Sequence, residues 1–178
     1  VMERVGRYVG DSKKLPSTTD IKKWFEWELA KLPLTKKEFV TLHEKGLASL
    51  VTYIDCVGNS IGVRSMQEFR CRVVLPTGDT DIPEVMLTGV IDRIDLDEEG
   101  SAVQFVDYKT GKIKTKGEIE GTTKNSHGDY KRQLVFYALL LSLYDDKRYV
   151  CNRGVLSFVE PDSKGAVKEV VYLSLIHI

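Results

Sequence analysis

The sequence has few cysteines, and their spacing does not suggest ligands or bridges. Cys56, Cys71 and Cys151 are its three cysteines, far apart and without a C-x-x-C pair. This spacing argues against a zinc site and against the disulfide framework of a small secreted protein. We therefore expect reduced thiols and an intracellular, cytoplasmic protein.

Several other features are missing. No apolar run approaches the roughly 18 residues needed to cross a bilayer, and no secretory signal peptide is present. Lys plus Arg and Asp plus Glu number 26 each, so the formal net charge is zero. This balance argues against a general positive coating but leaves room for a local basic patch. A G-x-x-x-x-G-K-[ST] phosphate loop is also missing, so any use of ATP would belong to another part or partner.

The length suits one globular domain. With 178 residues, 42% hydrophobic and 29% charged, the chain is long enough for a substantial core and short for two domains. It opens on Val1 and stops at the apolar LSLIHI, which predicts a fragment of a longer protein. We expect a single domain over residues 1–178, with a helical part over about 1–60 and a core over about 61–178.

The first third has helical periodicity. Apolar residues from Ile21 to Leu32 recur at three- and four-residue steps after the N-cap run STTD. In the following TKKE, Thr35 and Glu38 have the spacing of a capping box, which predicts a second helix. Trp24 and Trp27 are expected in the core or an interface rather than as base-stacking platforms.

The rest of the chain alternates between strand and helix patterns. Period-two alternation predicts strands over residues 67–75, 85–96 and 102–109, the last two joined by the acidic turn DEEG. Residues 113–129 have little apolar content and are expected to form a long loop. An almost wholly apolar stretch over 130–144 predicts a buried helix, and strands follow over 154–160 and 168–175. This order indicates an α/β fold, with α+β as the alternative: a sheet partly covered by helices.

Charged residues interrupt two neighbouring strands. Asp107 and Lys109 in VDYKTGK leave the same face of one strand, just before the Thr110–Gly111 turn. If the preceding hairpin turns between Glu99 and Gly100, Asp92 lies opposite Asp107, with Cβ atoms about 5 Å apart. Opposed carboxylates destabilise a strand pair unless they are neutralised, and a divalent cation such as Mg²⁺ or Mn²⁺ would do so. The alternative is a solvated face with an incidental ion pair.

A polar pair also interrupts the apolar helix. Gln133 and Tyr137 are four residues apart and therefore lie on one face, one turn from each other. A buried glutamine requires hydrogen-bond partners, so this pair is either structural or part of a site.

These motifs occur in a characteristic order. Glu68 on a strand, then LTGVIDRID, FVDYKTGK and RQLVFYALLL, resemble the RecB-type branch of the PD-(D/E)XK nuclease superfamily, particularly the C-terminal nuclease domain of UvrD/Rep-type helicases and AddB-like proteins. The resemblance covers roughly residues 66–141. It implies a restriction-endonuclease-like core, a mixed sheet flanked by helices, and hydrolysis of DNA with a bound divalent metal.

The resemblance assigns roles to residues of this chain. Asp92 and Asp107 would be metal ligands, joined by the backbone carbonyl of Tyr108, and Lys109 would be the catalytic lysine. Three further residues complete the set: Gln133 and Tyr137, which would support the site and contact DNA, and Glu68, whose role varies.

One expected ligand is missing from the resemblance. Members of this branch usually have a histidine on an early helix, in a G-x-x-x-H setting, and VMERVGRYV resembles the segment that follows it. The chain is therefore expected to begin just after that histidine. Of the three histidines, His43 lies in a predicted helix and is the candidate substitute, His127 falls in the predicted loop, and His177 is near the end.

Basic residues gather near the proposed site. Residues 109–132 hold seven Lys or Arg against three Asp or Glu, a local surplus of four. The segment is either an ordinary solvated loop or a surface that meets the phosphate backbone, in which case DNA binding would depend on salt.

Two functions follow. The first is a Mg²⁺- or Mn²⁺-dependent deoxyribonuclease, exonuclease-like, acting in DNA repair or recombination with a helicase motor in the same chain or complex. The second is a catalytically incomplete DNA-binding or docking module of a helicase, which the missing histidine would favour.

Overall fold

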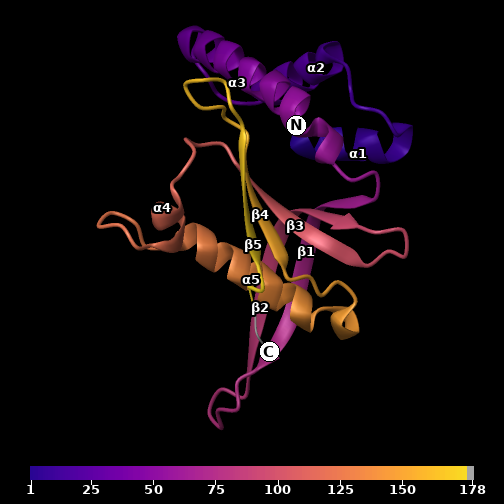
Figure 1. Cartoon of the computed structure of the whole chain (residues 1–178), viewed down its shortest axis with the longest axis vertical. Helices are drawn as coiled ribbons and strands as arrows, with labels where there is room; N and C mark the ends of the chain where they lie inside the picture. Colours follow the sequence, from indigo (N-terminus) through magenta and orange to yellow (C-terminus); the bar gives the residue numbers. More distant parts are fainter. Residues whose placement is uncertain (176–178) are drawn as a thin grey trace. The chain divides into compact units, whose positions relative to one another are not determined.

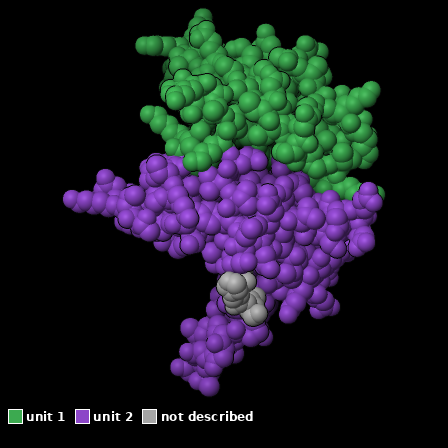
Figure 2. Space-filling view, in the orientation of Figure 1, with its two compact units in different colours: residues 1–65, 108–113, 158–168 green, residues 66–107, 114–157, 169–178 purple. Residues whose placement is uncertain are grey.

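The computed structural model describes residues 1–175, and in that range it contains five α-helices and five β-strands (Figure 1). His177 lies outside the described residues. Figure 2 colours two compact units separately. Unit 1 comprises residues 1–65, 108–113 and 158–168; unit 2 comprises residues 66–107, 114–157 and the described residues from 169 onward.

Unit 1 contains the first three helices, α1 (Met2–Ser12), α2 (Thr18–Leu29) and α3 (Lys36–Val57), followed by a short 3₁₀ turn, η1 (Gly58–Ser60). Capping boxes begin two of them. Ser17 and Asp20 cap α2, and Thr35 and Glu38 cap α3. In each pair, the side chain of either residue accepts a hydrogen bond from the backbone amide of the other. The predicted helical first third and its Thr35–Glu38 cap are therefore confirmed.

Apolar side chains from these helices form the core of unit 1, with Val5, Ile21 and Tyr53 almost fully buried. Trp24 packs against this core. Trp27 is 52% exposed and lies outside this core, so only the interface alternative remains, as a prediction. The Arg4 guanidinium and the Lys31 ammonium lie 4.1 and 3.1 Å from the centre of the Trp27 ring, so the exposed ring makes cation–π contacts.

The five strands form one sheet in the order β1-β2-β3-β4-β5. Their bounds are β1 (Ser65–Pro76), β2 (Glu84–Leu96), β3 (Ala102–Lys109), β4 (Arg153–Phe158) and β5 (Lys168–Leu173). Strands β2 and β3 are antiparallel, whereas β3 and β4 are joined through helices, a connection that parallel strands require. The predicted α/β fold with a mixed, helix-flanked sheet is therefore confirmed.

Helices α4 (Lys116–Glu120) and α5 (Asp129–Leu143) lie between β3 and β4. Helix α5 packs against β2, as Figure 1 shows, and buries Leu134, Leu140 and Leu141. The prediction of a continuous loop over 113–129 was wrong. Thr115 and Glu118 form a third capping box that starts α4, and Ile119 anchors this short helix in the core at 0% exposure.

The cysteine and membrane predictions can also be compared with the structure. All three cysteines are free thiols, with Cys56 exposed and Cys71 and Cys151 buried. Within residues 1–175, no helix combines the length and the apolar character that a membrane crossing requires.

Candidate active site

Two acids are aligned by the hairpin of β2 and β3. Arg93 faces Val106 and Ile94 faces Phe105, the register predicted from the sequence, and the pairing shifts only between Asp95 and Leu96 near the turn. Continued by one step, the same register would place Asp92 opposite Asp107. The turn holds its shape through the Asp97 carboxylate, which accepts hydrogen bonds from the backbone amides of Glu99 and Ser101.

Asp92 and Asp107 both affect the pKa of Tyr137. This residue is 7% exposed, and burial raises the pKa of its phenol to about 12. The hydrogen bond from Gln133 acts in the lowering direction, while the negative charges of Asp107 and Asp92 and a hydrogen bond to Asp107 raise the pKa further. Asp92, Asp107, Gln133 and Tyr137, from two strands and one helix, therefore come together in unit 2.

Helix α5 positions the polar pair. Gln133 Nε2 donates to Tyr137 Oη at 2.8 Å, as their spacing of one helical turn allows. The Tyr137 ring also meets Phe105 of β3 edge-on, with centroids 6.3 Å apart. The helix approaches β2 at Gly89, where a Cβ would lie 2.6 Å from a methyl carbon of Leu140. The glycine of LTGVID is therefore explained by helix–strand packing.

A buried network of charged and polar side chains lies next to Asp92 in the sequence and was not predicted. Arg93 is 1% exposed and Asp95 is 3% exposed; their Nε and Oδ1 atoms are 2.9 Å apart, and Arg93 Nη2 donates to Asp95 Oδ2 at 3.1 Å. Gln104 donates to Asp95 at 2.7 Å and accepts from Arg153 Nε at 2.9 Å. The network joins β2, β3 and β4 behind the hairpin that carries the acids. In the sequence, these residues appear as the alternating acids and arginine of IDRID. A strand whose polar side chains face solvent has the same pattern, so the pattern did not indicate a buried network.

Lys109 is related to the acids by its place on β3. It is the last residue of the strand, two positions after Asp107, and its carbonyl accepts a hydrogen bond from the Val159 amide at 2.9 Å. Tyr108 is half-buried in unit 1, where its ring meets Tyr53 edge-on at 6.2 Å between centroids. Asp107 and Lys109 therefore share a face of one strand.

Three other predicted residues lie apart from this group of contacts. Glu68 is exposed and has a φ of 48°, which interrupts the regular alternation of β1. His43 lies on α3, with Nε2 2.9 Å from Glu26 Oε1 and its ring stacked on Phe39 at 5.9 Å. These contacts give His43 a structural place among the helices of unit 1. His127 precedes α5 and lines a polar pocket.

The donor set for a metal is small. Across residues 1–175, no group of three or more His, Cys, Asp or Glu side chains is gathered for a metal. Asp92 and Asp107 are thus a pair of carboxylates without a third such ligand from the described side chains. A hard cation that keeps several waters, such as Mg²⁺, fits this set better than Zn²⁺, which takes its ligands chiefly from side chains.

The basic surplus over residues 109–132 is unchanged by the ion pairs within the segment. Lys114 pairs with Glu118 at 3.3 Å, Lys116 pairs with Glu120 at 3.9 Å, and Arg132 pairs with Asp129. The three acids of the segment are thus each paired with one of its cations. The other basic residues of the segment are Lys109, Lys112, Lys124 and Lys131.

Comparison with known proteins adds the family. A search of solved structures found the crystal structure of SSO0001, with a TM-score of 0.41, 14% identity, and coverage of 97% of this chain and 77% of that chain. A search of curated proteins found no significant match. The model of the PD-(D/E)XK nuclease superfamily matches residues 2–172, nearly the whole sequence. The chain therefore belongs to the PD-(D/E)XK nuclease superfamily.

Proposed function

We propose that this protein is a metal-dependent deoxyribonuclease, acting as an exonuclease on linear DNA in repair or recombination. The observation that supports the proposal is that Asp92 and Asp107 both act on the phenol of Tyr137 and raise its pKa. Membership of a nuclease superfamily supports the reaction class. We further propose that a helicase motor in the same polypeptide or complex supplies the DNA strand.

The metal in this proposal is Mg²⁺ or Mn²⁺, held by Asp92 and Asp107 and by the backbone carbonyl of Tyr108. Carboxylate and carbonyl oxygens are the donors that these hard cations prefer, and the remaining positions suit water and a phosphate oxygen of the substrate. When bound, the metal would act as a Lewis acid toward the phosphoryl group and would lower the pKa of a bound water.

The other residues would position the reacting groups and neutralise developing charge. Lys109, on the same face of β3 as Asp107, would orient the attacking water or balance the charge that develops on the phosphoryl oxygens. The phenol of Tyr137 stays protonated at neutral pH and can donate a hydrogen bond to Asp107. Gln133 fixes the position of the phenol by donating a hydrogen bond to its oxygen. Such outer contacts fix the direction of a ligand oxygen. Glu68, exposed on β1, would contribute a contact to DNA.

A second candidate is a DNA-binding or docking module of a helicase that does not cut. The observation in its favour is the lack of a third His, Cys, Asp or Glu gathered with the acids among the described residues. Both candidates predict DNA binding, so cleavage separates them.

Cleavage of end-labelled linear DNA, compared with a closed circle, tests the proposal. With Mg²⁺ or Mn²⁺ the wild-type protein should shorten the linear DNA and spare the circle, whereas Asp107→Asn and Lys109→Ala should abolish cleavage and retain DNA binding. Asp55→Asn, a change at an exposed acid of α3, is the matched control and should cut normally. DNA binding without metal-dependent cleavage by the wild-type protein would support the second candidate.

Metal titration by calorimetry gives an independent readout. Asp92→Ala should weaken Mn²⁺ binding strongly because it removes one of two carboxylate ligands. Unchanged affinity in this variant would show that the metal binds elsewhere.

A further inference from the structure

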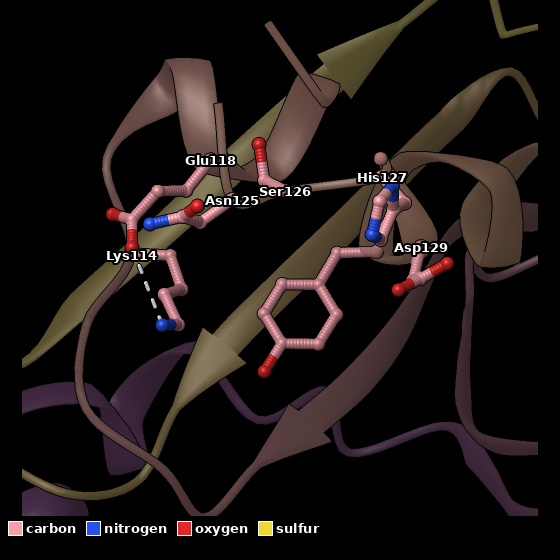
Figure 3. A pocket seen from close by; sticks show the side chains of 8 residues that line it. Lys114, Glu118, Asn125, Ser126, His127 and Asp129 are labelled. Atoms are coloured by element: carbon pink, nitrogen blue, oxygen red, sulfur yellow. Dashed lines mark hydrogen bonds and ion pairs between the residues drawn. The ribbon is translucent and has the colours of Figure 1, made fainter. Parts of the chain in front are cut away.

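A small polar pocket lies where α4 leads into α5. It has a volume of about 210 Å³ and is lined by Lys114 and Glu118 together with the consecutive residues Asn125, Ser126, His127, Gly128, Asp129 and Tyr130. Figure 3 shows Lys114, Glu118 and Asn125 on one side of it, and His127 and Asp129 on the other. The pocket belongs entirely to unit 2 and is separate from the pair of acids.

Two glycines hold the pocket loop closed. Gly121 and Gly128 have φ values of 77° and 73°, which favour glycine, and a Cβ on Gly121 would lie 2.6 Å from the Gly128 amide nitrogen. The Thr122 amide and the Ser126 hydroxyl further tie the loop to the Gly117 carbonyl. The loop is therefore fastened at both ends, and the side chains it presents are positioned by backbone contacts.

The charges of the pocket suit a nucleobase better than a phosphate. Lys114 is paired with Glu118, whose pKa is lowered by hydrogen bonds from Thr115 and Lys114, so the acid stays ionised beside its cation. Asp129 is held by Arg132. Donors and acceptors thus occur together without a net positive field, whereas a phosphate site would collect donors and cations. The edge of a base presents both donors and acceptors.

The pocket also offers an amide and rings. The Asn125 amide and the His127 ring line the pocket at exposed positions, and the half-buried Tyr130 contributes an aromatic ring to the lining. Asparagine can make paired hydrogen bonds to a base edge, and aromatic rings stack on bases of any sequence. The volume is below the roughly 300–1,000 Å³ of pockets for drug-sized ligands, which suits a single ring system.

Helix α5 connects the pocket with the acids. Tyr130, Gln133 and Tyr137 are spaced i, i+3 and i+7, so they form one stripe along the helix. The rise from Tyr130 to Tyr137 is about 10 Å. A DNA strand lying along this stripe would place one base in the pocket while a phosphodiester a few nucleotides away reached Asp92 and Asp107.

We propose that the pocket between α4 and α5 binds one unpaired base of a single-stranded DNA segment and so anchors the strand for cleavage. The inference rests on the proposed nuclease function and gives its substrate a single-stranded character near the cut. A duplex keeps its bases stacked and paired, so a base must be unpaired to enter a polar pocket of this kind.

Binding to two short oligonucleotides of equal length tests the inference. One carries all its bases, and the other is an abasic deoxyribose-phosphate chain, both labelled for fluorescence anisotropy in EDTA so that no cleavage occurs. Tyr130→Ala should weaken binding of the intact oligonucleotide about tenfold, and Asn125→Ala about fivefold. Neither change should alter binding of the abasic chain. Tyr130→Phe should bind as the wild type does, and Asn59→Ala, at an exposed asparagine of η1, is the matched control.

The outcomes separate the two proposals. Equal loss for the intact and abasic chains would make the pocket a backbone site and overturn base binding, as would no loss in either variant. If base-dependent binding is present but metal-dependent cleavage is not, the pocket stands and the nuclease proposal fails. No binding to either oligonucleotide by the wild-type protein overturns base binding, and the cleavage assay with metal decides the nuclease proposal separately. If Tyr130→Ala does not fold, the exposed Asn125 decides the test on its own.

Discussion

The buried pair of Arg93 and Asp95 gives the sharpest prediction about stability. Both side chains are almost fully withdrawn from water, and they are joined by two contacts of 2.9 and 3.1 Å. Replacing Arg93 with Met leaves the Asp95 carboxylate buried beside Gln104, and replacing Asp95 with Val leaves the guanidinium buried. Each single change therefore creates a buried charge without its main counter-charge.

The expected magnitude follows from this burial. Removing one partner of a buried pair lowers the free energy of unfolding by about 3–5 kcal/mol, whereas replacing both by apolar residues of similar volume is often neutral. A domain has about 5–15 kcal/mol in total, so each single variant should lose a large part of its stability. The double variant Arg93→Met/Asp95→Val should recover most of that loss.

Urea unfolding followed by circular dichroism measures the four proteins of this cycle. The control is Glu28→Gln, which breaks a pair with Lys31 of similar length, 2.8 Å, whose side chains are 48% and 38% exposed, and keeps the contact of Lys31 with Trp27. This exposed pair should be worth less than about 1 kcal/mol. Single variants as stable as Glu28→Gln, or a double variant whose loss equals the sum of the single losses, would refute the reasoning.

The remaining predictions concern thiols, the loop and the site. Burial raises the pKa of Cys71 to about 11 from 9.0, so a thiol reagent at pH 8 should modify the exposed Cys56 much faster; equal rates would contradict the burial. Since the folded state keeps this proton longer, the free energy of unfolding should fall as pH rises from about 9 to 11. Cys71→Ala should reduce that slope and leave the part that comes from Tyr137 and Cys151, whose pKa values burial also raises. Gly121→Ala should destabilise by about 1–3 kcal/mol in urea unfolding, and more than Gly78→Ala, which has a similar φ of 75° but open space around it; equal losses would show that close approach is unimportant. Gln133→Leu should reduce the cleavage rate about 10- to 100-fold without altering the thermal melting curve, and full activity would remove this residue from the site.

Local signals predicted the elements that they specify directly. The capping box of Thr35 and Glu38 gave the start of α3, because a cap needs only residues three positions apart. The same signal at Thr115 and Glu118 was overlooked because the surrounding segment has little apolar content. Sequence alone could have found α4, and the ion pairs of Lys114 and Lys116 at four-residue spacing could have been found with it.

Burial on both faces of a strand could not be predicted. Alternation reveals a strand when one face is solvated, but Arg93, Ile94 and Asp95 are consecutive and all buried. The sequence therefore suggested outward polar residues where the structure has an internal ion pair. Which elements cover the second face depends on contacts between distant segments, and the sequence pattern does not contain this information.

The candidate site was predicted in part. The register that pairs Arg93 with Val106 follows from the turn, and the spacing of Gln133 and Tyr137 follows from the helix. Their meeting across helix and sheet depends on how α5 packs against β2, which the sequence indicated only through the resemblance. The catalytic roles of these residues, and of Lys109, stay predictions.

The close approach of Gly121 and Gly128 has a consequence for protein engineering. The loop begins and ends at nearly the same point, because Gly121 and Gly128 are in close contact. The distance between α4 and α5 therefore does not depend on the length of the loop, and extra residues between the glycines need not move α5. The segment 122–127 could thus be exchanged as a cassette. A library of such cassettes would vary the side chains that line the pocket while the acids on β2 and β3 keep their places.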